Sequence, residues 1–160
     1  MAHSPEPVVR IRPLHREDAP SITALLENDA EGISWTGRIP WPFTLADANV
    51  WLDLVLPAGN AFAIEVDGQF AGCAGFDRGE VGYWVGLPFR GRGVASRALS
   101  QLLQRIHAAD HRHARATVFP GNDASVRILE KHGFRLTGEE EHDLPKRGGL
   151  RKLLIFELDL

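Results

Sequence analysis

Hydrophobic residues recur along this chain with two different periods, and each period predicts a different element. A short run of β-branched residues at Val8–Leu14 predicts a strand that stops near its proline. Residues 16–28 and 44–56 repeat apolar positions every three or four residues, and the second segment begins with the spacing of a capping box, so both are predicted to be helices. Residues 29–43, rich in Gly, Pro and Trp, are expected to be irregular.

The middle of the chain changes to the period of a strand. Two apolar runs within residues 61–76 flank Asp67–Gly68, a dipeptide typical of a two-residue hairpin turn. A third strand-like run covers residues 79–87, and Pro88 marks its expected end. From Val94 onward the apolar positions return to a spacing of three and four, which predicts a helix of about four turns.

The last third of the chain predicts a strand, a short helix and a final pair of strands. The first strand covers residues 114–119. Asn122 or Asp123 is suited to cap the short helix that follows, and Gly133 is suited to end it. The two final strands are expected to form a hairpin across residues 144–150.

The order of these elements predicts one α/β domain of the α+β type. The predicted order is one strand, two helices, three strands, a helix, a strand, a helix and two strands. This order implies a central mixed sheet covered by helices on both faces. No repeat or linker divides residues 1–160, so we expect a single domain, with residues 1–7 as a flexible N-terminal segment.

Composition narrows the class of protein. The net charge of −3 provides no basic field for nucleic acid or an anionic membrane. No apolar run reaches the length of a membrane span, and the N-terminus lacks the apolar core of a signal peptide. The single cysteine, Cys73, excludes an internal disulfide and fits a reducing compartment. We therefore expect a soluble, cytoplasmic domain that binds neither nucleic acid nor membrane.

The most informative stretch is "PFRGRGVASRAL", where a strand ends, a glycine-rich turn follows and a helix begins at once. The first N–H groups of a helix lack internal partners and carry partial positive charge, so such a turn is suited to bind an anion. Gly91 and Gly93 let the backbone approach a phosphate, and Arg90 and Arg92 add charge. The alternative is a plain surface turn. The spacing matches neither a Walker P-loop nor a dinucleotide fingerprint.

"RGRGVA" fits the Arg/Gln-x-x-Gly-x-Gly/Ala signature of the GNAT N-acetyltransferases, which holds the pyrophosphate of acetyl-CoA. Its surroundings, "EVGYWVGLPFRGRGVASRAL", resemble the strand, loop and helix of the RimJ/RimL-like branch. "IRPLHREDA", "WPFTLADANVWLD" and "NDASVRILEKHGFRLTGE" resemble that branch in the same order. The resemblance therefore spans about residues 8 to 158 and implies a mostly antiparallel, twisted sheet.

The resemblance also implies where acetyl-CoA binds. In this family the strand before the loop carries a bulge that splays it from its neighbour, and Gly86 fits such a bulge. Backbone groups of Val85 and Leu87 would then bind the pantetheine arm. The implied remaining contacts come from loop and helix amides, the Ser96 hydroxyl and an asparagine, namely Arg90, Gly91, Arg92, Gly93, Val94, Ala95, Ser96 and Asn122.

Acetyl transfer to an amine requires stabilisation of the departing thiolate. Many GNAT enzymes place a tyrosine seven residues after the asparagine, but here that position is Leu129, so the chain departs from this pattern. The RimJ/RimL branch instead implies Ser125, three residues after Asn122, as a donor to the sulfur and a further cofactor contact. The alternative for Ser125 is an ordinary first-turn serine.

The general base and the acceptor wall are less defined by the sequence. The acidic run at 139–143 and the acid that opens the strand before the loop offer Glu141 and Glu80 as bases, with solvated acids as the alternative. The candidates for binding the acceptor are the aromatic residues of the irregular segment, Trp35, Trp41 and Phe43, and the only tyrosine, Tyr83. For the three aromatic residues of the segment, the alternative is packing in the core. His107 and His111 have the spacing of a zinc pair and His113 lies close by, but the intervening glutamate of a metalloprotease motif is missing, so no metal site is expected.

These observations lead to one principal hypothesis and one alternative. The first is an N-acetyltransferase in which a primary amine, from a peptide N-terminus or a small molecule, attacks acetyl-CoA directly. The second is an acyl-CoA-binding or regulatory module that lacks turnover. Either a single chain or a homodimer is compatible with the sequence.

Overall fold

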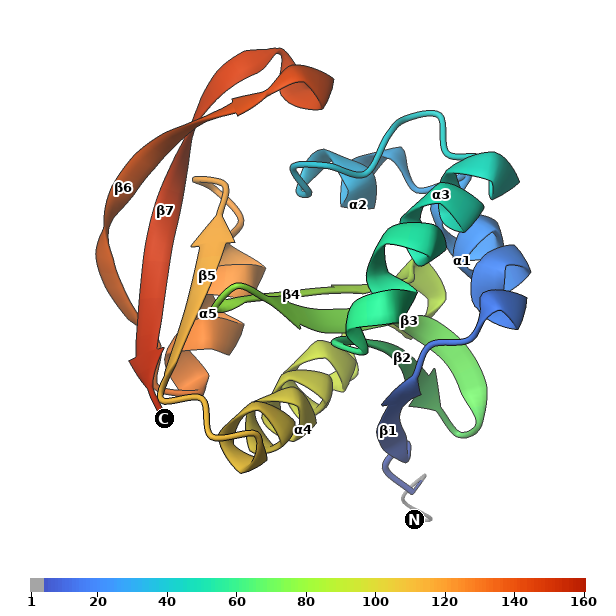
Figure 1. Cartoon of the computed structure of the whole chain (residues 1–160), viewed down its shortest axis with the longest axis horizontal. Coiled ribbons are helices and arrows are strands. Elements are labelled where there is room, and N and C mark those ends of the chain that lie inside the picture. Colours follow the sequence, from blue (N-terminus) through green and yellow to red (C-terminus); the bar gives the residue numbers. More distant parts are fainter. Residues whose placement is uncertain (1–4) are drawn as a thin grey trace.

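The computed structural model describes residues 5–160 and contains one seven-stranded sheet flanked by helices (Figure 1). Residues 1–4 of the expected N-terminal segment lie outside the described part. The strands, with their bounds, are β1 (Val9–Pro13), β2 (Ala61–Val66), β3 (Gln69–Asp77), β4 (Glu80–Val85), β5 (His113–Val118), β6 (Arg135–Leu144) and β7 (Gly149–Asp159).

Within residues 5–160, five α-helices and four short 3-10 turns connect the strands. The α-helices are α1 (Ala19–Leu26), α2 (Ala30–Ser34), α3 (Leu45–Val55), α4 (Val94–Ala108) and α5 (Asp123–Lys131). The 3-10 turns are η1 (Arg16–Asp18), η2 (Leu56–Ala58), η3 (Leu87–Phe89) and η4 (Pro145–Arg147).

The strands lie in the order β1-β2-β3-β4-β5-β7-β6. Every neighbouring pair is antiparallel except β4 and β5, which are parallel and pair only at Glu80 and Arg115. Beyond that point the two strands diverge, so the sheet opens like a V (Figure 1). The expected mixed, mostly antiparallel sheet with a splayed strand is therefore confirmed.

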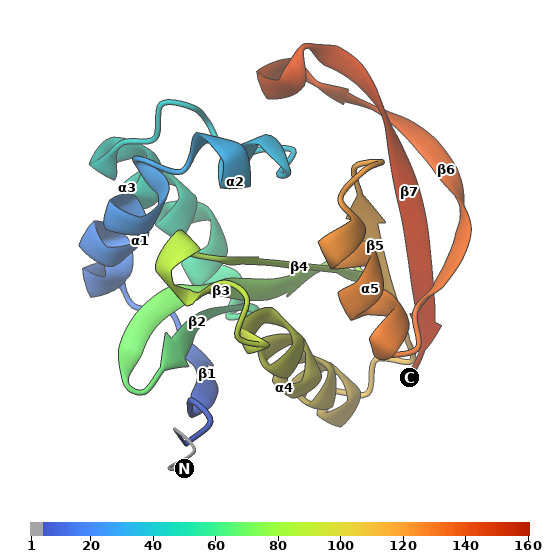
Figure 2. The ribbon, with the colours of Figure 1, turned by 180° about the vertical axis from the view of Figure 1, so that it is seen from behind.

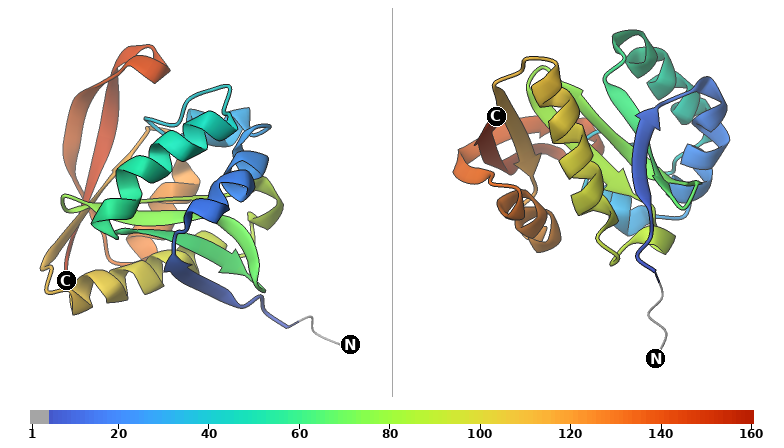
Figure 3. Two further views of the ribbon diagram at one scale, coloured as in Figure 1. Left: turned by 45° about the vertical axis from the view of Figure 1, so that its right-hand side comes forward. Right: turned by 90° about the horizontal axis from the view of Figure 1, so that it is seen from below.

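Helices cover both faces of the sheet, as expected. Helices α1 and α3 lie on the face turned to the viewer in Figure 1, and α4 and α5 lie on the face seen from behind in Figure 2. The view from below in Figure 3 shows the first strands between α4 and the α1–α3 pair. Each face has its own buried apolar cluster; Leu99 and Leu129 belong to one, and Ile22 and Leu52 to the other.

Local signals placed several element ends correctly. Thr44 and Asp47 form the expected capping box at the start of α3. Asp67 and Gly68 make the two-residue turn between β2 and β3, with φ of 50° and 82°. Such left-handed values match a type I′ turn, which follows the twist of the strands it connects.

Two local expectations were wrong. Residues 29–43 are not wholly irregular, because they contain α2, a five-residue helix too short to show a period. Gly86 does not form a bulge: the β3–β4 register runs without a shift, and Gly86 follows the last residue of β4. Instead, Leu25 of α1 packs so closely that a Cβ at Gly86 would lie 2.7 Å from its Cδ2.

Candidate active site

The V between β4 and β5 is closed at one end and open at the other. At the closed end Arg115 N donates to Gly79 O (2.7 Å). At the open end, Gly86 N donates to Ala71 O of β3 (2.7 Å), so the backbone groups of Val85 point away from β3 and toward β5. Arg90 Nε occupies the Val85 carbonyl, so the Val85 amide is the group at this inner edge of β4 with which an extended ligand arm can pair in the manner of a strand.

The glycine-rich loop lies immediately beyond this edge and leads into α4. Gly91 and Gly93 have φ of 76° and 73°, left-handed values that glycine adopts without a steric penalty. Nothing lies within 4 Å of a Cβ built on either glycine, so the space above the loop is open. Gly93 is the N-cap of the 15-residue helix α4 and provides no side-chain cap. The amides of the first turn therefore point toward that space, with the positive end of the helix dipole behind them.

Arg90 does not point into the loop's open space. Its guanidinium forms an ion pair with Asp29, and its Nε donates to Val85 O (2.8 Å). Its amide donates to Leu87 O (3.3 Å). The Asp29 side chain, which is 6% exposed, also caps α2 by accepting from Gly32 N (3.1 Å). Arg90 thus connects the loop to α2, and Asp29 is a residue that the sequence analysis missed.

This connection gives a testable prediction at Gly32. A Cβ there would overlap both the Asp29 carboxylate and the Arg90 guanidinium. Gly32→Ala should therefore destabilise the fold by about 1–3 kcal/mol, because the partly buried ion pair must separate. In an unstrained helix the same change would stabilise by about 1 kcal/mol. Urea unfolding measures the difference, with Gly138→Ala as the control, since a Cβ at Gly138 meets nothing within 4 Å. Equal stabilities for the two variants would contradict the prediction.

Two other residues predicted to contact the cofactor, Arg92 and Ser96, have side chains that lie near other residues of the protein. Arg92 is exposed, and its guanidinium carbon lies 5.8 Å from the centre of the Phe89 ring. Ser96 Oγ lies 3.0 Å from His132 Nε2 at the end of α5. Burial, together with the nearby Lys131 charge, lowers the pKa of His132. His132 is therefore neutral at neutral pH, and its Nε2 lies within hydrogen-bond distance of the Ser96 hydroxyl.

Ser125 lies at the start of α5, directly across the V from β4. Asn122 is the N-cap of this helix, and its Oδ1 accepts from Ser125 N (3.4 Å). Ser125 Oγ lies 3.1 Å from the Tyr83 hydroxyl of β4. The structure therefore brings together three residues singled out from the sequence: Asn122, Ser125 and Tyr83.

Of the two predicted bases, Glu80 lies on the other face of the sheet. Val81, Tyr83 and Val85 pack toward α4 and α5, so alternation turns Glu80 toward the α1–α3 face. Arg115 lies on that same face, because its neighbours Ala114 and Ala116 are buried in the α4–α5 cluster.

Of the acids on β6, Glu140 rather than Glu141 reaches this face. Arg115 donates to both carboxylate oxygens of Glu140, and this bonding lowers the pKa of Glu140. Alternation sends Glu141 to the opposite face of β6, where Glu139 pairs with Lys152 (3.4 Å). The structure thus brings Glu80, Arg115 and Glu140 together and separates Glu141 from them.

The aromatic residues of the segment between α1 and α3 separate into two groups. Trp35 and Trp41 are 41% and 49% exposed, whereas Phe43 is buried in the apolar cluster of the α1–α3 face. Arg147, at the tip of the β6–β7 hairpin, donates to the carbonyls of Ile33, Thr36 and Ile39 (2.6–2.7 Å). The hairpin tip is therefore fastened to the segment that carries the exposed tryptophans.

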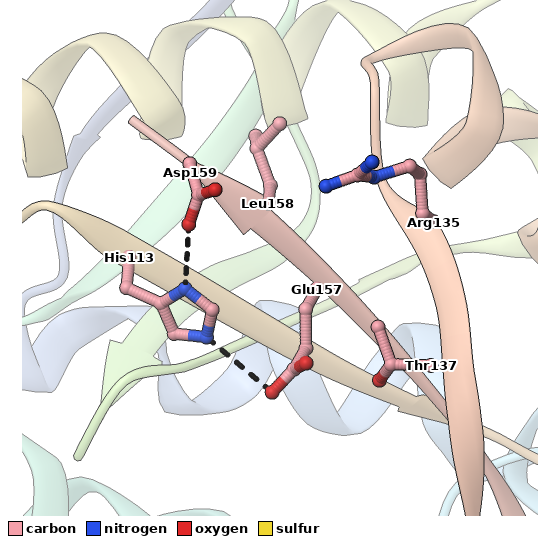
Figure 4. Close-up of a pocket in the computed structure, with 6 residues that line it drawn as sticks. All are labelled: His113, Arg135, Thr137, Glu157, Leu158 and Asp159. Atoms are coloured by element: carbon pink, nitrogen blue, oxygen red, sulfur yellow. Dashed lines mark hydrogen bonds and ion pairs between the residues drawn. The ribbon is translucent and has the colours of Figure 1, made fainter.

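A shallow polar pocket lies elsewhere, on β5, β6 and β7 (Figure 4). His113 lies 3.3 Å from Asp159 and 3.4 Å from Glu157, and Arg135 and Thr137 complete its polar lining. The pocket is at the start of β5, whereas Ser125 follows the end of that strand. It contains none of the residues predicted to bind the cofactor or the acceptor.

Other chemical groups take no part in this arrangement. Cys73 is buried, and its burial raises the pKa of the thiol, which makes it a poor nucleophile. His111 packs edge-on against Phe76, with ring centres 4.7 Å apart. Over residues 5–160, no helix has the length and apolar character needed to cross a membrane, and no three His, Cys, Asp or Glu residues gather as metal ligands.

Comparisons with known proteins agree with this geometry. A family model described as "Acetyltransferase (GNAT) domain" matches residues 9–135. A sequence search of curated proteins finds no match.

Several solved structures share the fold. RimJ of Mycobacterium smegmatis in complex with CoA-disulfide is 26% identical, with a TM-score of 0.81 over 94% of this chain and 81% of that one. RimL, a ribosomal L7/L12 alpha-N-protein acetyltransferase in complex with coenzyme A, is 19% identical, with a TM-score of 0.81 over 95% and 94%. YncA, a putative acetyltransferase of Salmonella typhimurium with its cofactor acetyl-CoA, is 22% identical, with a TM-score of 0.73 over 95% and 94%.

Proposed function

This chain belongs to the GNAT acetyltransferase family, and on that premise we propose that it transfers the acetyl group of acetyl-CoA to the α-amine of a peptide. The observation that carries the proposal is the position of Ser125 at the V, with its Oγ 3.1 Å from the hydroxyl of Tyr83 on β4, the strand that leads into the glycine-rich loop. The open end of the V presents the backbone edge of β4 and the start of α4, which is suited to bind an anion, and Ser125 presents a hydroxyl donor. Acetyl-CoA has a matching group for each: an extended arm for the strand edge, a pyrophosphate for the helix start and a thioester sulfur for the hydroxyl.

The cofactor would extend from the loop into the V. The amides from Gly91 to Ser96 would hold the pyrophosphate, with Arg92 adding charge. The backbone of Val85 and Leu87 would bind the pantetheine arm, and Asn122 would orient it. Because its side chain is paired with Asp29, Arg90 would stabilise the loop rather than bind phosphate.

Transfer would then proceed by direct attack. The amine nitrogen attacks the thioester carbonyl carbon, the C–S bond breaks, and its electron pair leaves on the sulfur. Ser125 Oγ–H donates a hydrogen bond to that sulfur, and the N-terminus of α5 favours its negative charge. The amine would therefore lie on the face of the sheet that carries Glu80 and Glu140. The leaving sulfur would lie on the face that carries the hydroxyls of Ser125 and Tyr83.

Glu80 is the proposed base. Glu140 is held by Arg115 and has a lowered pKa, which makes it a weak proton acceptor. Glu80 lies beside this pair and has no hydrogen-bonded side-chain partner within the described residues, so it is free to accept a proton directly or through water. An α-amine, with a pKa of about 8, needs less help from a base than a lysine amine at about 10.4, which favours a peptide N-terminus as acceptor.

The acceptor would approach over the α1–α3 face. Trp35 and Trp41 would form one wall, and the tip of the β6–β7 hairpin, which Arg147 fastens to the same segment, would border it. Phe43 takes no part, since its side chain belongs to the core.

The direct test is to mix the protein with acetyl-CoA and a panel of amines and to follow the release of free thiol. The panel contains peptides with different N-terminal residues, the same peptides with blocked N-termini, lysine side-chain amines and small polyamines. Thiol release that depends on a free peptide N-terminus supports the proposal. Release with small amines alone would exclude a peptide acceptor, and no release with any amine would exclude turnover.

Acetyl-CoA should also stabilise the fold measurably. A ligand present at 100 times its dissociation constant stabilises the folded state by about 2.7 kcal/mol. For a chain of this size the melting temperature should rise by about 5–10 °C. Differential scanning fluorimetry provides the measurement, with desulfo-CoA and adenosine as comparison ligands. An unchanged melting temperature at saturating acetyl-CoA would contradict the cofactor assignment.

A further inference from the structure

A side-chain hydrogen bond crosses the V. The hydroxyl of Tyr83 on β4 and the Oγ of Ser125 on α5 lie 3.1 Å apart. The backbones of the two strands meet only at Glu80 and Arg115. Tyr83 is three residues beyond that point, where β4 no longer pairs with β5, so its side chain reaches α5 across the diverging strands.

Tyr83 is held firmly enough to place its hydroxyl. Its ring packs against the buried cluster of the α4–α5 face, between Val81 and Val85 on the same face of β4. A tyrosine has only two side-chain torsions, so packing of the ring fixes the position of the hydroxyl. Ser125 is held in turn by its backbone bond to Asn122.

We infer that Tyr83 is a positioning residue for Ser125: its hydroxyl donates to Ser125 Oγ and thereby directs the Ser125 hydrogen toward the thioester sulfur. The inference rests on the proposed acetyl transfer. A serine hydroxyl has one hydrogen and two acceptor lone pairs. When Tyr83 supplies a hydrogen to one lone pair, the Ser125 hydrogen remains available for the sulfur. Hydrogen bonds in such a chain also polarise one another, which strengthens the Ser125 donor.

The protonation state of Tyr83 is consistent with this direction. Burial raises the pKa of Tyr83, and this effect exceeds the opposing effect of the bond to Ser125. The phenol therefore keeps its proton over the whole neutral range and remains a donor. No proton leaves Tyr83 during the reaction: the C–S electron pair stays on the sulfur, which accepts the Ser125 hydrogen bond, and the amine proton leaves on the other face.

Tyr83→Phe tests the inference, because it removes the hydroxyl and keeps the packed ring. We expect kcat to fall about tenfold, because a lost hydrogen bond that stabilises the transition state by about 1.4 kcal/mol slows the reaction by that factor. The KM for acetyl-CoA should be nearly unchanged. In the Ser125→Ala background the same substitution should have no further effect, because Tyr83 acts through Ser125. Thr137→Val, which removes a hydroxyl on β6, is the matched control. Additive effects of Tyr83→Phe and Ser125→Ala would overturn the inference.

A second measurement needs no acceptor amine. Product CoA has a free thiol, and donors aimed at its sulfur favour the thiolate, so the pKa of bound CoA should lie below that of free CoA. Thiolate absorbance against pH, with desulfo-CoA as the blank, gives this value. Tyr83→Phe and Ser125→Ala should each raise it by about one pKa unit, and the double variant should raise it no further than Ser125→Ala does.

Tyr83 is the only tyrosine of the chain, which allows a test without mutation. Biosynthetic replacement of tyrosine by 3-fluorotyrosine alters Tyr83 alone and makes its hydroxyl a stronger donor. The pKa of bound CoA should then fall below the value for the unlabelled protein. This arm also covers the case in which Tyr83→Phe does not fold.

The outcomes separate the two proposals. If Ser125→Ala alters the thiol pKa and Tyr83→Phe does not, the inference fails and the role of Ser125 stands. If CoA binds with an unshifted thiol pKa in the unaltered protein, both roles fail. If the thiol pKa behaves as expected and no amine is acetylated, the inference stands and the proposed acceptor is wrong.

Discussion

Ser125→Ala should lower kcat for acetyl transfer about a hundredfold. Removing one donor aimed at charge that develops in the transition state costs roughly 10²–10³ in rate. Before attack the thioester sulfur is neutral and accepts hydrogen bonds poorly, so the loss should fall on the transition state. The dissociation constant for acetyl-CoA should therefore change by less than about threefold. Stopped assays of thiol release give kcat, and calorimetric titration gives the affinity.

The matched control is Ser21→Ala. Ser21 also lies in the first turn of a helix, α1, but on the other side of the sheet from α5. Removing its hydroxyl should leave both kcat and acetyl-CoA affinity unchanged. An equal loss of kcat in the two variants would indicate general destabilisation. Full activity in Ser125→Ala would remove Ser125 from the mechanism.

Elements with strong local signals were predictable from the sequence. The 15-residue helix α4 shows four turns of apolar spacing, and the turn at Asp67–Gly68 follows from its dipeptide. Asn122 caps α5 and Gly133 has a φ of 90° just after it, as predicted. Each of these features depends on residues within about one helical turn, so the sequence contains the whole cause.

Features that depend on distant partners were not predictable. Gly86 stands out in an apolar run, but the side chain that requires it is Leu25, far away in the sequence. The expected bulge was therefore the wrong explanation for a correctly noticed glycine. Similarly, nothing near Arg90 in the sequence indicates that its partner is Asp29, which lies 61 positions earlier.

The acids of β6 show the same limit within a single strand. Alternation predicts that neighbouring residues face opposite sides, but it does not say which side is which. Only the register of β6 with β7, together with the reach of Arg115, assigns Glu140 to the face of Glu80. Glu141 was therefore a reasonable candidate that the fold turns away.

The structure places the proposed base and the proposed thiolate donor on opposite faces of the sheet, an arrangement that the sequence did not reveal. One strand, β4, carries Glu80 on one face and Tyr83 on the other, and beyond Glu80 it diverges from β5. A continuous sheet would separate these groups by its own hydrogen-bonded backbone. In the proposed mechanism the splay would therefore admit the cofactor and also let Glu80 and Ser125 act on opposite sides of one carbonyl.

Gly93→Val should weaken the binding of acetyl-CoA about a hundredfold. Gly93 has a φ of 73°, and a β-branched residue in this conformation costs about 1–2 kcal/mol, so the backbone would rotate away. Rotation would redirect the first amides of α4, and each charge-assisted hydrogen bond to phosphate contributes roughly 1.5–3 kcal/mol. The loop is exposed, so the loss of folding stability should be smaller than the loss of binding energy. Calorimetric titration and urea unfolding measure the two quantities.

Gly59→Val separates strain from binding. Gly59 has a φ of 68°, and a Cβ built on it meets nothing within 4 Å, as at Gly93. Gly59 follows η2 and is far from the glycine-rich loop in the sequence. Both variants should lose similar stability, because both place a side chain in the left-handed region. Only Gly93→Val should lose affinity for acetyl-CoA and for desulfo-CoA, since both ligands carry the pyrophosphate. If Gly93→Val binds both ligands as tightly as Gly59→Val does, the loop does not hold the phosphates, and the pyrophosphate site must be sought elsewhere.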